Sequence, residues 1–293
     1  MSFFIETLIA GFLAGTMYSL VAIGFVLIYK ASGVFNFAQG SMVLFAALFF
    51  VTILEFGLPF WACFIVTAAI MSLGAVLVER LVLRPLVNSS IITLFMATLG
   101  LSFIIEGLAQ GFMGTSVHNL DIGVNDVPYI MGDIFISQFD IFSALVAGIL
   151  VVGLSLFFSK TRVGILLRAV ADDPLASQAI GIRLPNIARI IWVVAGFVAL
   201  VTGLLWGARQ GVQFALSLSA LKALPVLIIG GFTSIRGAII GGLLIGAGEV
   251  LADVYIGPIL GGGISAWFAY LIAVLFLMIR PTGMFGDPTI ERV

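Results

Sequence analysis

Three long stretches without a charged residue follow one another at the start of the chain. Twenty-three uncharged residues separate Glu6 from Lys30, and 24 more lead from Lys30 to Glu55. A further 23 lie between Glu55 and Glu79. Because a helix needs about 20 apolar residues to cross the hydrocarbon core of a bilayer, the first 80 residues predict three membrane-spanning helices.

The rest of the chain continues this pattern. Of its 293 residues, 62% are hydrophobic and only 9% are charged, too few polar side chains to cover a soluble globule. Further spans are predicted at 90–112, 141–159 and 190–208, and in a closing run from Val254 to Ile279. No stretch of about ten residues alternates polar and apolar side chains as a barrel strand must. Helices are therefore expected throughout the membrane.

Basic residues mark one side of the predicted membrane. The loop 160–189 carries five of the 13 basic residues, whereas residues 113–137 contain no Lys or Arg. Since loops rich in Lys and Arg stay in the cytoplasm, we expect 160–189 to be cytoplasmic and 113–137 to be external. Counting spans from there places the N-terminus outside and the C-terminus inside.

This orientation requires the region from Leu221 to Ile256 to leave the outer face and return to it. Its first half, Ala223 to Ile235, has only 13 residues. A short or re-entrant helix is predicted there, followed by a glycine-rich turn within 230–242. The alternative is a flexible loop between two ordinary spans. The predicted fold class is all-α: a polytopic transmembrane bundle of eight or nine hydrophobic segments with short or broken helices, in one domain over residues 1–293.

Several functional classes lack the residues that they need. None of the lysines, Lys30, Lys160 and Lys222, stands in the Gly-Lys-Ser/Thr motif of a phosphate-binding loop. One histidine, His118, and one cysteine, Cys63, do not make a metal site of the usual kind. No basic patch outside the loops favours nucleic-acid binding. We therefore expect no catalytic residue, no metal and no cofactor, and any ATP would be bound by partner subunits.

One segment of the cytoplasmic loop, 168–182, reads as a short helix that ends at Gly181. An acidic pair precedes Pro174, which suits a helix N-terminus, and a glycine suits the helix end. Ala176 and Ala179 are three residues apart and share a face that another surface can approach closely. The segment resembles the coupling loop by which the permeases of ABC importers dock on their ATPase subunits. The resemblance implies a docking set of Arg168, Asp172, Asp173, Ala176, Ala179 and Gly181.

Read with its surroundings, the chain resembles the LivH-type permease subunits of branched-chain amino acid ABC importers. The matching segments are GTMYSLVAIGFVLIYKASGVFNFAQGS at 15–41, ERLVLRPL at 79–86, RVGILLRAVADDPLASQAIGI at 162–182, LIIGGFTSIRGAIIGGLLIGAGE at 227–249 and RPTGMFG at 280–286. One departure is Gln39, where many relatives carry His.

The resemblance implies a multi-pass protein of the bacterial inner membrane that transports a branched-chain or other hydrophobic amino acid. Its implied partners are a LivM-like permease subunit, two ATPase subunits, a periplasmic binding protein and the membrane lipid. Because Gln39 departs from the common pattern, urea or short amides stay alternative substrates.

Candidate residues for the translocation path lie in three places. Asn36 and Gln39, three residues apart, either line or gate the path or belong to a turn between helices. A second group, Thr16, Tyr18 and Ser19, lies within the first span, where hydroxyls also serve helix packing. Gly230 and Gly231 complete the candidate set.

Acidic residues within the apolar runs leave a third mechanism open. Glu106 interrupts the fourth run and could carry a proton or cation in a secondary transporter, or could lie near the outer interface. Glu249 and Asp253 are expected near the outer interface as well. Three glycine pairs at small-xxx-small spacing are predicted to let helices pack closely: Gly11 with Gly15, Gly203 with Gly207, and Gly237 with Gly241.

Overall fold

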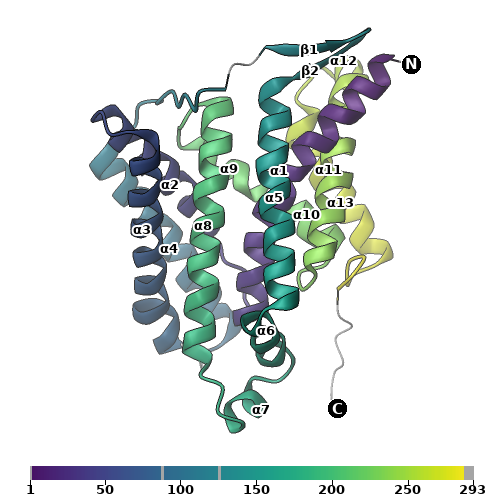
Figure 1. The fold of residues 1–293 in the computed structure, drawn as a ribbon. Helices are drawn as coiled ribbons and strands as arrows, with labels where there is room; N and C mark the ends of the chain where they lie inside the picture. Colours follow the sequence, from purple (N-terminus) through teal and green to yellow (C-terminus); the bar gives the residue numbers. More distant parts are fainter. Residues whose placement is uncertain (1, 87–88, 125–126, 287–293) are drawn as a thin grey trace. The chain divides into compact units, whose positions relative to one another are not determined.

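Long apolar helices make up most of the computed structural model, which describes residues 2–86, 89–124 and 127–286 (Figure 1). Within these residues, seven helical stretches are long and apolar enough to cross a membrane. They are α1 (Ser2–Ser32), α2 (Ala38–Glu55), α3 (Phe60–Val78) with its continuation η1 (Glu79–Leu83) and η2 (Arg84–Leu86), α4 (Ile91–Met113), α5 (Gln138–Lys160), α8 (Leu184–Gln210) and α11 (Ile235–Tyr255).

Two shorter apolar helical segments complete the set among the described residues. The first joins α9 (Ala215–Leu221) to α10 (Ala223–Gly230), and the second is α13 (Phe268–Ile279). With the seven long helices they make nine apolar segments. The predicted all-α bundle of eight or nine segments with short or broken helices is confirmed.

The chain divides into two compact units. The first comprises residues up to 26, 123–152 and those from 222 onward, and the second comprises 27–122 and 153–221. Helices α1 and α5 each contribute residues to both units. The single permease domain expected over residues 1–293 stays a prediction.

In the first unit, glycines bring helix backbones into contact. A Cβ added at Gly11 would lie 2.6 Å from the Cα of Ala247, and one at Gly15 would lie 2.7 Å from the carbonyl oxygen of Gly242. Gly241 packs in the same way against the carbonyl of Val226. The close helix packing predicted for these small residues is confirmed, for α1 against α11 and for α10 against α11.

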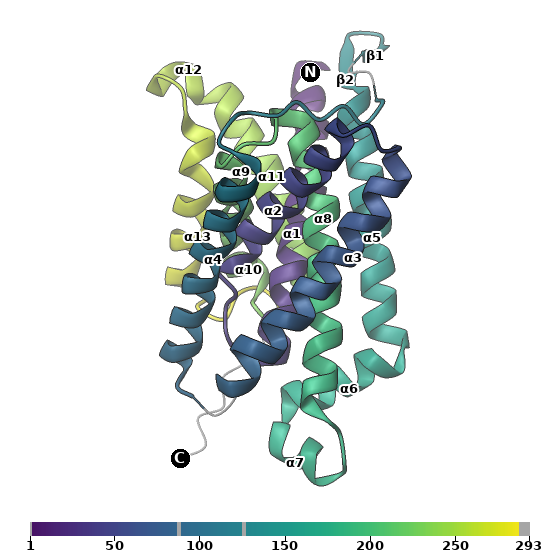
Figure 2. The ribbon, with the colours of Figure 1, turned by 90° about the vertical axis from the view of Figure 1, so that its left-hand side faces the viewer.

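In the second unit, α2 packs against α4, α8 and α9, and α3 packs against α8. Figures 1 and 2 show these helices side by side. A Cβ added at Gly203 would lie 2.6 Å from the carbonyl oxygen of Val43, so α8 lies directly on α2. Along α8, whose 27 residues make it about 40 Å long, one face is almost continuously buried.

Paired side chains mark the two ends of the second unit. At the C-terminal end of α8, His118 forms an isolated antiparallel bridge with Val212 and its Nδ1 lies 2.8 Å from the Glu55 carboxylate. At the N-terminal end, Arg189 pairs with Glu79. The basic loop 160–189 and residues 113–122, which contain no Lys or Arg, therefore lie at opposite ends of this unit, in keeping with the predicted orientation.

The closing run Val254 to Ile279 does not form one span, so this prediction is wrong. Helix α11 ends at Tyr255, and α12 (Gly257–Leu260) and η3 (Ile264–Ala266) precede α13. Three consecutive glycines, Gly261 to Gly263, have φ values of +90°, +88° and +71°. Side chains other than glycine rarely adopt this backbone region, so the run has the hydrophobicity of a span but breaks in its middle.

The loop 113–137 contains a small antiparallel hairpin that the sequence analysis did not predict. Strands β1 (Pro128–Met131) and β2 (Ile134–Ser137) pair in register, with Met131 opposite Ile134. Gly132, with φ +66°, supplies the tight two-residue turn between them. The backbone N–H of Phe135 donates to a carboxylate oxygen of Glu6 at 3.3 Å, which ties the hairpin to α1 in the same unit.

Candidate functional site

The segment 168–182 forms an elbow of two helices instead of the single helix expected. Helix α6 (Arg162–Asp172) stops at Asp173, which has an extended backbone, and α7 (Pro174–Ala179) begins at the next residue. Proline lacks an N–H and disfavours a helical conformation in the residue before it, which explains the break. An Asp173 side-chain oxygen accepts the Ala176 N–H at 3.0 Å, and the chain turns at Gly181 with φ +89°.

Contacts to the end of α5 hold α6 in place. The Thr161 hydroxyl caps α6 by accepting the Gly164 N–H at 3.3 Å. Gly164 packs against the backbone of Phe158, and an Arg168 guanidinium nitrogen donates to the Phe158 carbonyl at 2.8 Å. Movement of the elbow is thus mechanically tied to the end of a long helix.

Five residues of the docking set lie at the end of α6 and in α7 or just after it, whereas Arg168 lies in the middle of α6. Figure 2 shows α7 beyond the N-terminal end of α8 and α6 beside that end. All six residues are exposed: Arg168, Asp172, Asp173, Ala176, Ala179 and Gly181. Small side chains and short carboxylates therefore leave the α7 backbone open to close approach by another surface.

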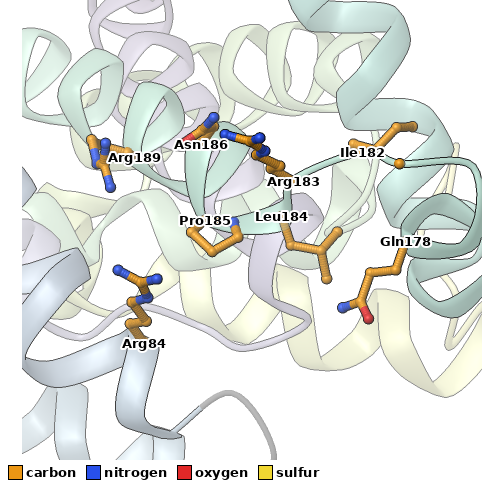
Figure 3. Close-up of a pocket in the computed structure, with 9 residues that line it drawn as sticks. Arg84, Gln178, Ile182, Arg183, Leu184, Pro185, Asn186 and Arg189 are labelled. Carbon is orange, nitrogen blue, oxygen red and sulfur yellow. The ribbon is translucent and has the colours of Figure 1, made fainter.

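A cavity of about 520 Å³ lies beside the elbow (Figure 3). It is lined by Arg84 at the end of the α3 stretch and by Arg183 and Arg189 at the start of α8. The polar side chains of Gln178 and Asn186 also line it. No sequence motif predicts this cavity, although both segments share positive charge on the predicted cytoplasmic face, which was the available signal.

Asn36 and Gln39 lie at the connection between α1 and α2. Both side chains are fully buried, at 0% exposure. An Asn36 side-chain oxygen accepts the Ala38 N–H at 3.1 Å, and Gln39 donates to the Ala195 carbonyl at 3.4 Å. Asn36 lies before the first residue of α2, in the turn between the two helices, as one of the two interpretations predicted. Because Gln39 lies within α2 and Asn36 does not, the two amides do not share a helix face.

Each of these two amides keeps one atom without a partner in the described part of the chain, Nδ2 of Asn36 and Oε1 of Gln39. An unpaired buried polar group costs about 1–3 kcal/mol. Such a cost is typical of sites kept for function, so these residues stay the strongest candidates for the translocation path.

The remaining path candidates make backbone packing contacts. The Thr16 hydroxyl donates to the Leu13 carbonyl at 2.7 Å, and the Ser19 hydroxyl donates to the Gly15 carbonyl at 2.8 Å. Tyr18 is half-buried beside them. Since hydroxyls bonded to the preceding helical turn are already satisfied, these contacts favour the packing interpretation.

Gly230 and Gly231 form a backbone junction. A Cβ added at Gly230 would meet the backbone of Gly237, and one at Gly231 would lie 2.5 Å from the backbone nitrogen of Gly286. The Phe285 N–H donates to the Gly230 carbonyl at 3.1 Å. The RPTGMFG segment at 280–286 thus packs on the turn after α10, and these glycines are needed for that close approach.

Acidic residues within the helices have polar partners. The Ser41 hydroxyl lies 2.9 Å from a Glu106 carboxylate oxygen and 2.6 Å from the Ser102 hydroxyl. In the first unit, Glu249 is buried at 4% exposure and its Oε1 accepts from Lys222 Nζ at 2.8 Å. The sequence analysis did not pair Lys222 with Glu249.

The described residues thus form a bundle of apolar helices with an exposed small-residue elbow on the predicted cytoplasmic face, an arrangement that suits a transport permease. The family model described as branched-chain amino acid transport system / permease component matches residues 7–280. The chain belongs to this family, and it is the permease subunit of an ABC importer, a non-catalytic transport component.

Curated relatives match nearly the whole chain. The high-affinity branched-chain amino acid transport system permease protein BraD of Pseudomonas aeruginosa is 29% identical over 310 residues, covering 99% of this chain and 98% of the relative. LivH of Escherichia coli is 28% identical over 312 residues, with the same coverage. The fructose import permease protein FruF of Bifidobacterium longum is 25% identical over 280 residues, covering 90% of this chain and 74% of the relative.

A solved structure supports the fold. PsaBC from Streptococcus pneumoniae in complex with Fab matches with a TM-score of 0.51 and 15% sequence identity. The match covers 94% of this chain and 90% of that chain.

Proposed function

We propose that this chain forms one half of a permease that imports a branched-chain or other hydrophobic amino acid across a bacterial inner membrane. The observation that carries the proposal is the near full-length similarity to BraD and LivH, both permeases of branched-chain amino acid systems. An ABC importer permease works with ATPase subunits and a substrate-binding protein. A LivM-like subunit is the proposed second half of the permease.

The elbow is the proposed docking site for the ATPase subunits. Its exposed small residues allow close approach, and its contacts to Phe158 connect it to α5. Closure of an ATPase dimer on the elbow would move α6 and tilt the helix to which it is anchored. The permease itself needs no phosphate-binding motif for this mechanism.

The proposed path residues are Asn36 and Gln39. Their unpaired amide atoms provide a donor and an acceptor within the second unit, as a polar, zwitterionic solute requires. Neither residue carries a charge that would bind such a solute tightly. Weak binding suits a translocation path, because the solute must also leave the site.

Uptake by the reconstituted transporter tests the proposed substrate. Proteoliposomes that contain this chain, its partner permease, the ATPases and the binding protein are given leucine, urea, acetamide and fructose in separate assays. The proposal predicts ATP-dependent uptake of leucine well above the other three. Preferred uptake of urea or acetamide would favour the amide alternative that Gln39 raises, and preferred uptake of fructose would contradict an amino acid substrate altogether.

A further inference from the structure

The cavity beside the elbow carries a concentrated positive charge. Three arginines are among its lining residues, Arg84, Arg183 and Arg189, and no acidic residue is. Figure 3 shows Arg84 reaching from its own helix toward the start of α8, which carries Pro185 and Arg189. Like charges gathered around one space repel one another unless an anion occupies it.

Only one of the three arginines has an acidic partner in the described part of the chain. Arg189 Nε lies 3.4 Å from an oxygen of Glu79, which is buried at 2% exposure. No ion pair joins Arg84 or Arg183 to a carboxylate of the described residues. These two guanidinium groups are free to bind an external anion.

The cavity lies where two predicted spans end. Arg84 belongs to the last turn of the stretch Phe60–Leu86, and Arg183 immediately precedes the first residue of α8. Both ends lie on the face that the distribution of basic residues assigns to the cytoplasm. Ile182, Leu184 and Pro185 provide an apolar wall beside the charged groups. The site thus combines positive charge with apolar surface at the predicted cytoplasmic ends of two spans.

We propose that this cavity binds the phosphate of an anionic phospholipid of the cytoplasmic leaflet. Arginine recognises phosphate through paired N–H donors, and basic pockets at the cytoplasmic ends of membrane helices suit anionic headgroups. An acidic segment of an ATPase subunit is the competing occupant, because Gln178, Gly181 and Ile182 of the elbow segment also line the cavity. The position of Arg84 and Arg183 at the ends of two predicted spans favours the lipid. The remaining docking residues are exposed and do not line the cavity.

The test compares lipid retention by the purified transporter complex, measured by native mass spectrometry. The probes are phosphatidylglycerol, the zwitterionic phosphatidylcholine and inorganic phosphate. The test variant is Arg84→Gln with Arg183→Gln, and Arg189 is left in place because its loss would strand the buried Glu79 carboxylate. The matched control is Arg162→Gln, an exposed arginine at the start of α6 that does not line the cavity.

The proposal predicts retention of phosphatidylglycerol about tenfold tighter than that of phosphatidylcholine, a free-energy difference of about 1.4 kcal/mol. The double variant should lose this preference, the control should keep it, and Arg84→Lys with Arg183→Lys should restore part of it. Equal retention of both lipids, or an unchanged preference in the double variant, overturns the proposal. Binding of inorganic phosphate without lipid, or loss of the ATPase subunits with lipid preference intact, overturns it too.

Discussion

Lys222 Nζ lies 2.8 Å from Glu249 Oε1. This ion pair connects Lys222, the residue between α9 and α10, to the C-terminal half of α11. The Glu249 side chain is 5% exposed and the Lys222 side chain is 31% exposed. The lysine therefore reaches the surface of the unit, whereas the carboxylate depends on the lysine for its neutralisation.

This relationship predicts that losing Lys222 alone is worse than losing both charges. Lys222→Met leaves a buried carboxylate unpaired and should lower the free energy of unfolding by about 2 kcal/mol. The double variant Lys222→Met with Glu249→Leu should recover part of that loss, because no buried charge is left. Thermal unfolding of the purified complex measures both. Strictly additive losses would show that the two residues are not coupled.

Close glycine packing predicts a position-dependent effect of a single methyl group. A Cβ added at Gly246 would lie 2.5 Å from the carbonyl oxygen of Gly11, so Gly246→Ala should destabilise the fold by about 1–3 kcal/mol. Gly100→Ala is the matched control, because a Cβ there would meet nothing within 4 Å. It should be neutral or stabilising by about 0.5 kcal/mol. Equal melting temperatures for the two variants would contradict the packing of α1 on α11.

The elbow predicts a loss of ATPase association without a loss of fold. Ala176→Trp places a large side chain on the exposed face of α7 and should reduce co-purification of the ATPase subunits at least tenfold. A bulky residue at Gly181 is a weaker test, because φ +89° makes any side chain there strained.

The matched control for the elbow is Ser159→Trp, at an exposed position near the end of α5. It should keep the ATPase subunits, and both variants should melt with the parent chain. If the Ala176→Trp variant still retained the ATPase subunits, α7 would not belong to the docking surface.

The buried amides predict that a substitution can lower transport without lowering thermal stability. Gln39→Met removes an unpaired buried oxygen and should leave the melting temperature unchanged or raise it, while uptake falls at least fivefold. Thr202→Val removes another buried unpaired oxygen, Oγ1, in α8 and should stabilise without changing uptake. Parent-level uptake by Gln39→Met, measured in proteoliposomes, would exclude this residue from the path.

Helices and loops whose positions depend on both hydrophobicity and charge are the elements that the sequence predicts best. The cytoplasmic loop was predicted at 160–189, and α5 ends at Lys160 while α8 begins at Leu184. The prediction of one span from Val254 to Ile279 is wrong because hydrophobicity carries no information on backbone geometry. Three glycines with positive φ break the run.

The sites are harder to predict from the sequence, because tertiary packing brings together the residue pairs that form them. Arg84 and Arg183 meet at one cavity although one lies at the end of the α3 stretch and the other immediately precedes α8. Lys222 and Glu249 likewise meet only when α10 folds back on α11. Local motifs do not carry this information, whereas the turn chemistry of Pro174 and Gly181 does mark the elbow.

The central claim, that this chain is a conduit driven by ATP hydrolysis in other subunits, is tested most directly by leucine accumulation in proteoliposomes. The account predicts accumulation against a gradient when the ATPases, the binding protein and ATP are present. This accumulation should persist when a protonophore dissipates the proton gradient and in the variant Glu106→Gln. Accumulation by the chain without ATPases, abolished by the protonophore and by Glu106→Gln, would contradict the account.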